Sequence, residues 1–295
     1  PQAEDGRLTG LQVSAGADGA AFRAAGFQPG ETAEADVGIA SAWVCDELPR
    51  LYDIYKEIHE FRTMPAFDGA PLRFRRLSLL PWRYWVPLAF VILEKFDRNS
   101  PSRAPALREL ERWCFVVNLL GWDEETVADR VANGIAVLRD KQNPFWGGKP
   151  LCVTARQKTL ARQRLNDGQF DDRHRRRAHV RWLETYLWDG ERIPKEAVAR
   201  EKTVEHVLPR RASGQWLIDF PTNVAIYAEK IGNLCLLPHD NLKAEQYEIK
   251  RAAYLKFKGP HRSISDVATY ERWNAQAVDE RTNKLTELAV NALRL

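Results

Sequence analysis

The chain has 295 residues, 44% of them hydrophobic and 28% charged, with 44 Lys and Arg against 40 Asp and Glu and a net charge of +4. This composition predicts a globular protein long enough for two domains and excludes collagen-like and wholly disordered chains. No stretch approaches the roughly 20 uninterrupted apolar residues of a membrane-spanning helix, so we expect no membrane partner and a cytoplasmic location.

Charge is distributed unevenly along the sequence. Residues 1–60 carry four basic and eleven acidic side chains and sum to −7, so the remaining residues sum to +11 and form the part suited to a polyanion. Residues 1–40 are also rich in Ala and Gly, which predicts an acidic tail or linker. The chain starts at Pro1 and its only methionine is Met64, so we expect a fragment of a longer protein.

The pattern of apolar side chains over residues 41–190 predicts an α-helical domain. Apolar side chains recur at spacings of three and four over 41–61, with an interruption near Pro49, and residues 82–96 are apolar all round, as in the central helix of a bundle. Asp123 is suited to cap a helix and Pro105 to occupy a first turn. The remaining helices are expected over 105–120, 123–139, 154–166 and 171–188.

Basic residues concentrate toward the end of this domain, among them Arg175, Arg176 and Arg177. Helical spacing spreads them around most of the helix, so some of them face solvent or a partner. Two interpretations stay open here. One is a solvated face paired with neighbouring carboxylates, and the other is a set of contacts to phosphates.

Residues 191–295 predict a second domain that contains a strand, a loop, a second strand and a helix. A short strand is expected at 203–206, ending in a Glu-His pair, and a second strand at 231–237. A helix is expected from Asn241 to about Lys256. The order strand, loop, strand, helix is that of a ββα unit.

The polar residues of this unit suit phosphodiester hydrolysis. That reaction needs a base near the attacking water and a cation that neutralises the developing charge. A neutral imidazole at His206 suits the base, and the oxygens of Glu205 and Asn241 suit a hard cation such as Mg²⁺. Asn233 could hydrogen-bond the backbone near His206. The other histidines lack comparable neighbours and are expected to be surface or core residues.

Three segments together resemble a known family. They are E-H-V-L-P at 205–209, I-G-N-L-x-L-L at 231–237, and an asparagine followed by a Lys-containing helix. They resemble the C-terminal nuclease domain of GmrSD-type modification-dependent restriction endonucleases, a branch of the HNH or His-Me finger superfamily. The closing segment from Trp273 also resembles that family's ending. The resemblance covers roughly 170–295 and, weakly, the helical region before it.

The resemblance implies a mainly α fold, with a helical domain followed by a small ββα-metal (His-Me finger) nuclease domain and surrounding helices. It implies a metal-dependent DNA endonuclease, the effector part of a bacterial restriction and anti-phage defence protein. His206 matches the family's general base and Asn233 its structural asparagine. Glu205 and Asn241 match its metal ligands. The cofactor would be a divalent cation, Mg²⁺ with Mn²⁺ as a substitute.

Two departures from the family pattern bear on the site. Arg210-Arg211 follows Pro209 where the family often has Gln, which adds phosphate contacts. The family's second helix asparagine is absent, so His239 and Asp240 are alternative metal or phosphate contacts. The expected partners are DNA and an upstream sensor and nucleotide-handling domain, and a homo-oligomer is left open. DNA contacts are expected from Arg175, Arg176, Arg177, Arg210, Arg211, Lys243, Lys250 and Arg251.

A non-catalytic alternative stays open from the sequence. In this alternative the nuclease fold has lost its metal site and serves as a DNA-binding or partner-docking module. RNA as the substrate is less favoured, because no RNA-reading motif occurs.

Overall fold

Helices make up most of the described chain, which confirms the mainly α class. The computed structural model describes residues 43–60, 70–168, 173–188, 193, 203–237, 242, 246–257, 259 and 261–295. Its contacts divide the chain into two compact units, Pro1–Tyr52 and Asp53–Leu295. The predicted acidic tail over 1–40 lies outside the described residues. The division into domains at residue 190 stays a prediction.

The helices predicted before residue 190 are confirmed, with small shifts of their ends. A π-helical turn, Trp43–Glu47, leads into α3 (Leu48–His59), so the winding changes directly before Pro49. One further helix, α4 (Ala70–Leu77), was not predicted. The others are α5 (Trp85–Lys95), α6 (Arg103–Leu120), α7 (Glu124–Arg139), α8 (Ala155–Asp167) and α9 (Arg173–Tyr186). None of the helices in the described part has the length and apolar character that a membrane crossing requires.

Local sequence explains where these helices begin. The side chain of Asp123 accepts a hydrogen bond from the backbone N–H of Thr126 at 2.8 Å and caps α7, as predicted. Thr154 and Gln157 form a reciprocal capping box at the start of α8. α5 is buried on most sides, as its sequence predicted. Its buried residues are Trp85, Leu88, Ala89, Val91, Ile92 and Leu93.

The second half of the chain contains the predicted hairpin and more helices than the sequence indicated. β1 (Thr203–His206) pairs antiparallel with β2 (Leu234–Leu237). The segment expected as a loop holds α10 (Gln215–Asp219) and α11 (Val224–Glu229). The first three residues of the expected second strand form a 3₁₀ turn, η4 (Ile231–Asn233), so the strand begins only at Leu234. The helices that follow are α12 (Tyr247–Lys256), α13 (Arg262–Ala268) and α14 (Ala275–Leu293).

The two faces of the hairpin bury side chains against different helices. Because side chains alternate along a strand, Leu234 and Leu236 lie on one face, where they cluster with Val204 and with Val180 of α9. Cys235 and Leu237 lie on the other face, in a cluster with residues of α12, α13 and α14. The hairpin is therefore enclosed between α9 on one side and α12 and α13 on the other.

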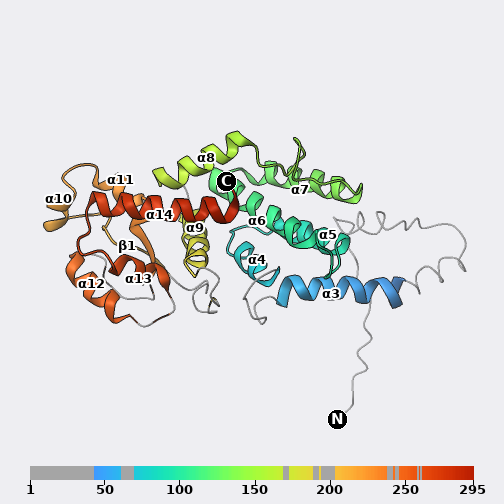
Figure 1. Cartoon of the computed structure of the whole chain (residues 1–295), viewed down its shortest axis with the longest axis horizontal. Coiled ribbons are helices and arrows are strands. Elements are labelled where there is room, and N and C mark those ends of the chain that lie inside the picture. Colours follow the sequence, from blue (N-terminus) through green and yellow to red (C-terminus); the bar gives the residue numbers. More distant parts are fainter. Residues whose placement is uncertain are drawn as a thin grey trace, which may run out of the picture. The chain divides into compact units, whose positions relative to one another are not determined.

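α14 joins the two largest hydrophobic clusters of the unit Asp53–Leu295. Its first turns pack with the hairpin cluster through Ala277 and Val278. Leu285, Ala289 and Leu293, nearer its end, belong to the cluster formed by α5, α6 and their neighbours. Figure 1 shows this helix, in red, running from the region of α11 toward α6.

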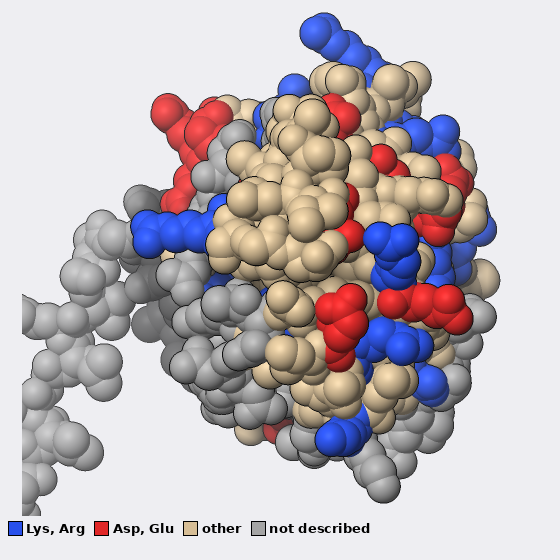
Figure 2. All heavy atoms as spheres, turned by 90° about the vertical axis from the view of Figure 1, so that its left-hand side faces the viewer, with Lys and Arg blue, Asp and Glu red and all other residues tan. Residues whose placement is uncertain are grey.

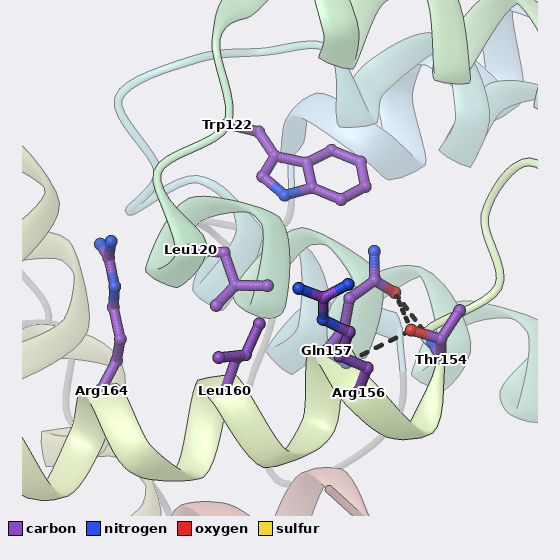
Figure 3. Close-up of a pocket in the computed structure, with 7 residues that line it drawn as sticks. All are labelled: Leu120, Trp122, Thr154, Arg156, Gln157, Leu160 and Arg164. Atoms are coloured by element: carbon purple, nitrogen blue, oxygen red, sulfur yellow. Dashed lines mark hydrogen bonds between the residues drawn. The ribbon is translucent and has the colours of Figure 1, made fainter.

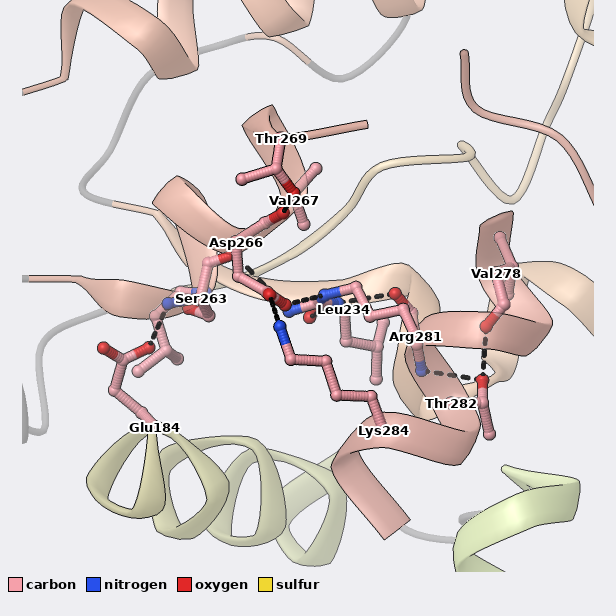
Figure 4. A network of polar contacts seen from close by, with 12 residues as sticks. Glu184, Leu234, Ser263, Asp266, Val267, Thr269, Val278, Arg281, Thr282 and Lys284 are labelled. Atoms are coloured by element: carbon pink, nitrogen blue, oxygen red, sulfur yellow. Dashed lines mark hydrogen bonds and ion pairs between the residues drawn. The ribbon is translucent and has the colours of Figure 1, made fainter. Parts of the chain in front are cut away.

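A buried guanidinium fixes the hairpin to α13 and α14. Arg281 has no exposed surface, and it pairs with Asp266 of α13 at 2.7 Å. It also donates to the backbone carbonyls of Gly232 at 2.5 Å, within η4, and of Leu234 at 2.9 Å, the first residue of β2 (Figure 4). Any side chain at Gly232 would collide with the backbone of Val278 on α14, so only glycine permits this approach.

Replacing Arg281 with methionine should destabilise the fold strongly. Loss of the guanidinium leaves the backbone carbonyls of Gly232 and Leu234 buried without their donor and leaves Asp266 with only the exposed Lys284, which we expect to cost about 3–5 kcal/mol of unfolding free energy. Lys284 also pairs with Asp266, but its side chain is 56% exposed, so Lys284→Met should cost less than about 1 kcal/mol. Urea unfolding of both variants measures the difference, and equal losses would contradict the clamp.

The unfolding free energy should also fall in mild acid because of His179. Burial lowers the pKa of this fully buried α9 residue to about 4, whereas an unfolded histidine titrates near 6.5. Below pH 6.5 the unfolded chain therefore binds a proton that the folded chain does not, and the difference grows until about pH 4, to at most about 3 kcal/mol. His179→Gln should flatten this pH dependence in urea titrations. An unchanged dependence would show that His179 is not its source.

Candidate active site

His206 ends β1 on the face of the hairpin that packs against α9. It lies opposite Leu234 in the register, so its ring points to the same side as Val204. Its Nε2 atom is 3.4 Å from a guanidinium nitrogen of Arg176 on α9 and 3.9 Å from a carboxylate oxygen of Glu229. The His206 side chain is 19% exposed, so one side of the ring remains accessible.

Two arginines form ion pairs with the carboxylate of Glu229 beside this ring. Arg176 reaches Oε2 at 2.5 Å. Arg210, four residues after His206, makes a two-pronged contact, with Nε 2.5 Å from Oε1 and a terminal nitrogen 3.2 Å from Oε2. We call His206, Arg176, Arg210 and Glu229 the His206 cluster. The cluster places the carboxylate of Glu229, which the two arginines hold, directly beside the imidazole of His206.

The electrostatics of the His206 cluster keep the imidazole neutral. Burial is the main reason that the pKa of His206 falls to about 4. Arg210, Arg176 and Lys250 lower this pKa as well, while the carboxylate of Glu229 raises it. The ring is therefore unprotonated at neutral pH and able to accept a proton.

Glu205 points to the opposite face of the hairpin, toward α12. Its carboxylate accepts a hydrogen bond at 3.0 Å from the ammonium of Lys250, which also donates to the backbone carbonyl of His206 at 2.9 Å. The Lys250 side chain has no exposed surface. The sequence predicted that Lys250 contacts DNA and that Glu205 is a metal ligand. The structure instead buries Lys250 against the Glu205 carboxylate, whereas His206 lies beside Arg176 on the other face.

Asn233 anchors the chain directly after β1. It lies in η4, not in the middle of a strand as the sequence predicted, and it is fully buried. Its oxygen accepts from the backbone N–H of Leu208 at 2.7 Å and from the indole of Trp273 at 3.0 Å. Its nitrogen donates to the carbonyls of Leu208 at 2.9 Å and Ala228 at 3.0 Å. The expected contact to the backbone near His206 is thus present.

The segment of the chain that contains this hairpin is similar to a known protein family. Residues 155–288 match the family model of the C-terminal domain of GmrSD restriction endonucleases. The match confirms the resemblance drawn from the sequence, and it extends from α8 through most of α14. No curated protein and no solved structure matches the chain.

The GmrSD match therefore includes every residue of the His206 cluster. Sequence reasoning found His206 from its motif and named both arginines, but it did not identify Glu229. Glu229 lies at the end of the unpredicted helix α11, 23 positions after His206, and no local pattern marks it. Only the tertiary fold brings it to the ring.

The described residues of the segment that matches the family model do not form a metal site on their own. Within them, no group of three or more His, Cys, Asp or Glu side chains could hold a metal ion. Glu205 is occupied by Lys250. The other predicted ligands or phosphate contacts, Asn241, His239 and Asp240, lie outside the described residues.

The remaining predicted DNA contacts occupy different environments. Arg211 is exposed and Arg177 is half-buried. Arg175 and Arg251 are also half-buried, and each donates a hydrogen bond at 3.1 Å to a backbone carbonyl. Lys243 lies outside the described residues. Contact of these residues with DNA stays a prediction.

Charges of both signs are mixed on the side of the molecule that carries α10, α12 and α13. Figure 2 shows its Lys and Arg side chains interspersed with Asp and Glu around an area without charges. Large apolar side chains are exposed on α10 and α11, namely Leu217, Ile218 and Ile226. Binding of a polyanion on this side would therefore depend on individual arginines and not on a continuous basic surface.

A separate pocket lies between the end of α6 and α8. Its volume is about 400 Å³, and its lining combines Trp122, Leu120 and Leu160 with Arg156 and Arg164 (Figure 3). It shares no residue with the His206 cluster.

Replacing Asn233 with alanine should destabilise the domain and weaken any activity of His206. Its hydrogen-bond partners would remain buried and unsatisfied, so we expect a loss of about 3 kcal/mol or more of unfolding free energy. Asn291 on α14 is exposed, and Asn291→Ala should change stability by less than about 0.5 kcal/mol. Urea unfolding compares the two variants. A loss at Asn233 as small as that at Asn291 would contradict the anchoring role.

Proposed function

We propose that this chain is a metal-dependent DNA endonuclease that hydrolyses phosphodiester bonds in the His-Me finger manner. We further propose that it is the effector part of a modification-dependent restriction system that acts against phage. The match to a restriction-endonuclease domain supports nuclease function and DNA as the substrate. The observation that carries the catalytic proposal is a neutral, partly exposed imidazole beside two arginines.

In this proposal His206 accepts a proton from the attacking water. A general base has to lie within hydrogen-bond reach of the proton that it removes, directly or through one water. The ring is partly exposed, and its position is set by β1 and by the Asn233 contacts that follow it. Asn233 acts here as a positioning residue.

A divalent cation, Mg²⁺ or Mn²⁺, is part of the proposal. Such an ion would neutralise the charge that develops on the scissile phosphate and the leaving oxygen. Glu205 and Asn241 are the proposed ligands, with His239 and Asp240 as alternatives. Carboxylate and amide oxygens are the donors that such cations prefer. The Glu205 carboxylate is paired with Lys250 on the face of β1 opposite His206, so binding of the ion there would require Glu205 to give up that contact.

His206→Ala should abolish cleavage of plasmid DNA in Mg²⁺ or Mn²⁺ and leave DNA binding intact. The substitution removes the base but keeps the arginines that would contact phosphates. Conversion of supercoiled plasmid to nicked or linear forms measures the activity, and EDTA should stop it in the wild-type chain.

The same assay separates the enzyme from the non-catalytic alternative. Cutting by His206→Ala at the wild-type rate would refute the assignment of the base. Salt-sensitive DNA binding by the wild-type chain, without any metal-dependent cutting, would identify a binding module.

A further inference from the structure

In the His206 cluster an anionic group is already bound between two arginines. This group is a side chain of the protein itself, the carboxylate of Glu229. Glu229 supplies it from the end of α11, while Arg176 comes from α9 and Arg210 from the segment after β1. We propose that Arg176 and Arg210 form the binding site for the scissile phosphate, and that the Glu229 carboxylate holds its place in the DNA-free protein. This inference rests on the proposed nuclease function.

The contacts of Glu229 are those that a phosphodiester could reproduce. A guanidinium presents parallel N–H donors, which match the two oxygens of a carboxylate or of a phosphate. Arg210 uses both donors on Glu229, and Arg176 adds a third contact at 2.5 Å. One oxygen of this anion is 3.9 Å from Nε2 of His206. A phosphate in the same place would therefore lie within reach of the base through a water molecule.

The exposure of the cluster increases from one side to the other. The side chain of Arg176 is 10% exposed and that of His206 19%, whereas Glu229 is 33% and Arg210 53% exposed. Arg176 and His206 thus form the floor of the site, and Arg210 lies at its opening. An extended polyanion could reach the floor from solvent once the carboxylate moves aside.

The Glu229 side chain can leave while the backbone stays in place. Gly168, at the end of α8, packs so closely against Lys230 and the carbonyl of Glu229 that any side chain there would collide with them. The backbone around Glu229 is therefore fixed, and rotation of its side chain alone exchanges one anion for another. Arg176 is never left buried without a counter-charge in this exchange.

Glu229 is consequently an internal competitor of DNA. Its removal should raise the affinity for DNA, and removal of Arg176 should lower it. A purely structural role for Glu229 predicts the opposite, because the two arginines would then lose the group that positions them.

The test compares Glu229→Gln with Asp279→Asn in the complete chain. Both substitutions remove one negative charge from partly exposed carboxylates that pair with cations, but Asp279 contacts Lys230 and not the His206 cluster. Binding of a short fluorescein-labelled duplex DNA is measured by fluorescence anisotropy in EDTA over a series of salt concentrations. We expect Glu229→Gln to tighten binding severalfold and Asp279→Asn to have a much smaller effect.

The arginine is tested in the same assay. Arg176→Gln should weaken binding about tenfold, because it removes a charge-assisted hydrogen bond, and lower the salt slope by about one. Weaker binding by Glu229→Gln, or the same affinity as Asp279→Asn, would overturn the proposal, as would an unchanged affinity and slope for Arg176→Gln. Thermal unfolding checks that each variant folds, and the Glu229 comparison decides the question even if Arg176→Gln does not.

These outcomes are distinct from failure of the nuclease proposal. If Glu229→Gln binds more tightly while the wild-type chain does not cut plasmid, the phosphate site stands and the nuclease function falls. If cutting depends on His206 while Glu229→Gln binds no more tightly than Asp279→Asn, the nuclease function stands and the phosphate site falls.

Discussion

The position of the whole candidate site depends on the buried guanidinium of Arg281. Burying a charge without partners is costly, so its contacts to Asp266 and to the carbonyls beside β2 constrain where the hairpin can lie. α14 carries this guanidinium and also packs into both large hydrophobic clusters. α14 thus couples the hairpin to α5, α6 and the helices packed with them.

The alternation of side chains along β1 then separates the contacts of Glu205 from those of His206. Neighbouring residues of a strand face opposite ways, so Glu205 meets Lys250 of α12 while His206 meets Arg176 of α9. Asn233 fixes the backbone immediately after the strand through contacts to Leu208. The two sides differ in access, because Lys250 is fully buried whereas His206 and Arg210 reach solvent. The side of the hairpin that solvent can reach is therefore the one that carries His206.

The sequence was most informative where local patterns determine structure. Helical periodicity and capping residues located α5 to α9, and the motifs around His206 and Asn233 located both strands. α10, α11 and α13 were missed because helices of five to seven residues contain too little periodicity to be recognised. Lys250 was predicted to contact DNA. Its burial was not foreseen, because it depends on Glu205, which is 45 residues away in sequence. Glu229 was not identified for the same reason, because its contacts to the His206 cluster also depend on residues distant in sequence.

The most direct test of the account is a crystal structure of the His206→Ala chain bound to a short duplex DNA in the presence of Mg²⁺. The account predicts a backbone phosphate between the guanidinium groups of Arg176 and Arg210, beside the former position of the imidazole, with the Glu229 carboxylate displaced. DNA bound elsewhere, with Glu229 still paired to both arginines, would contradict it.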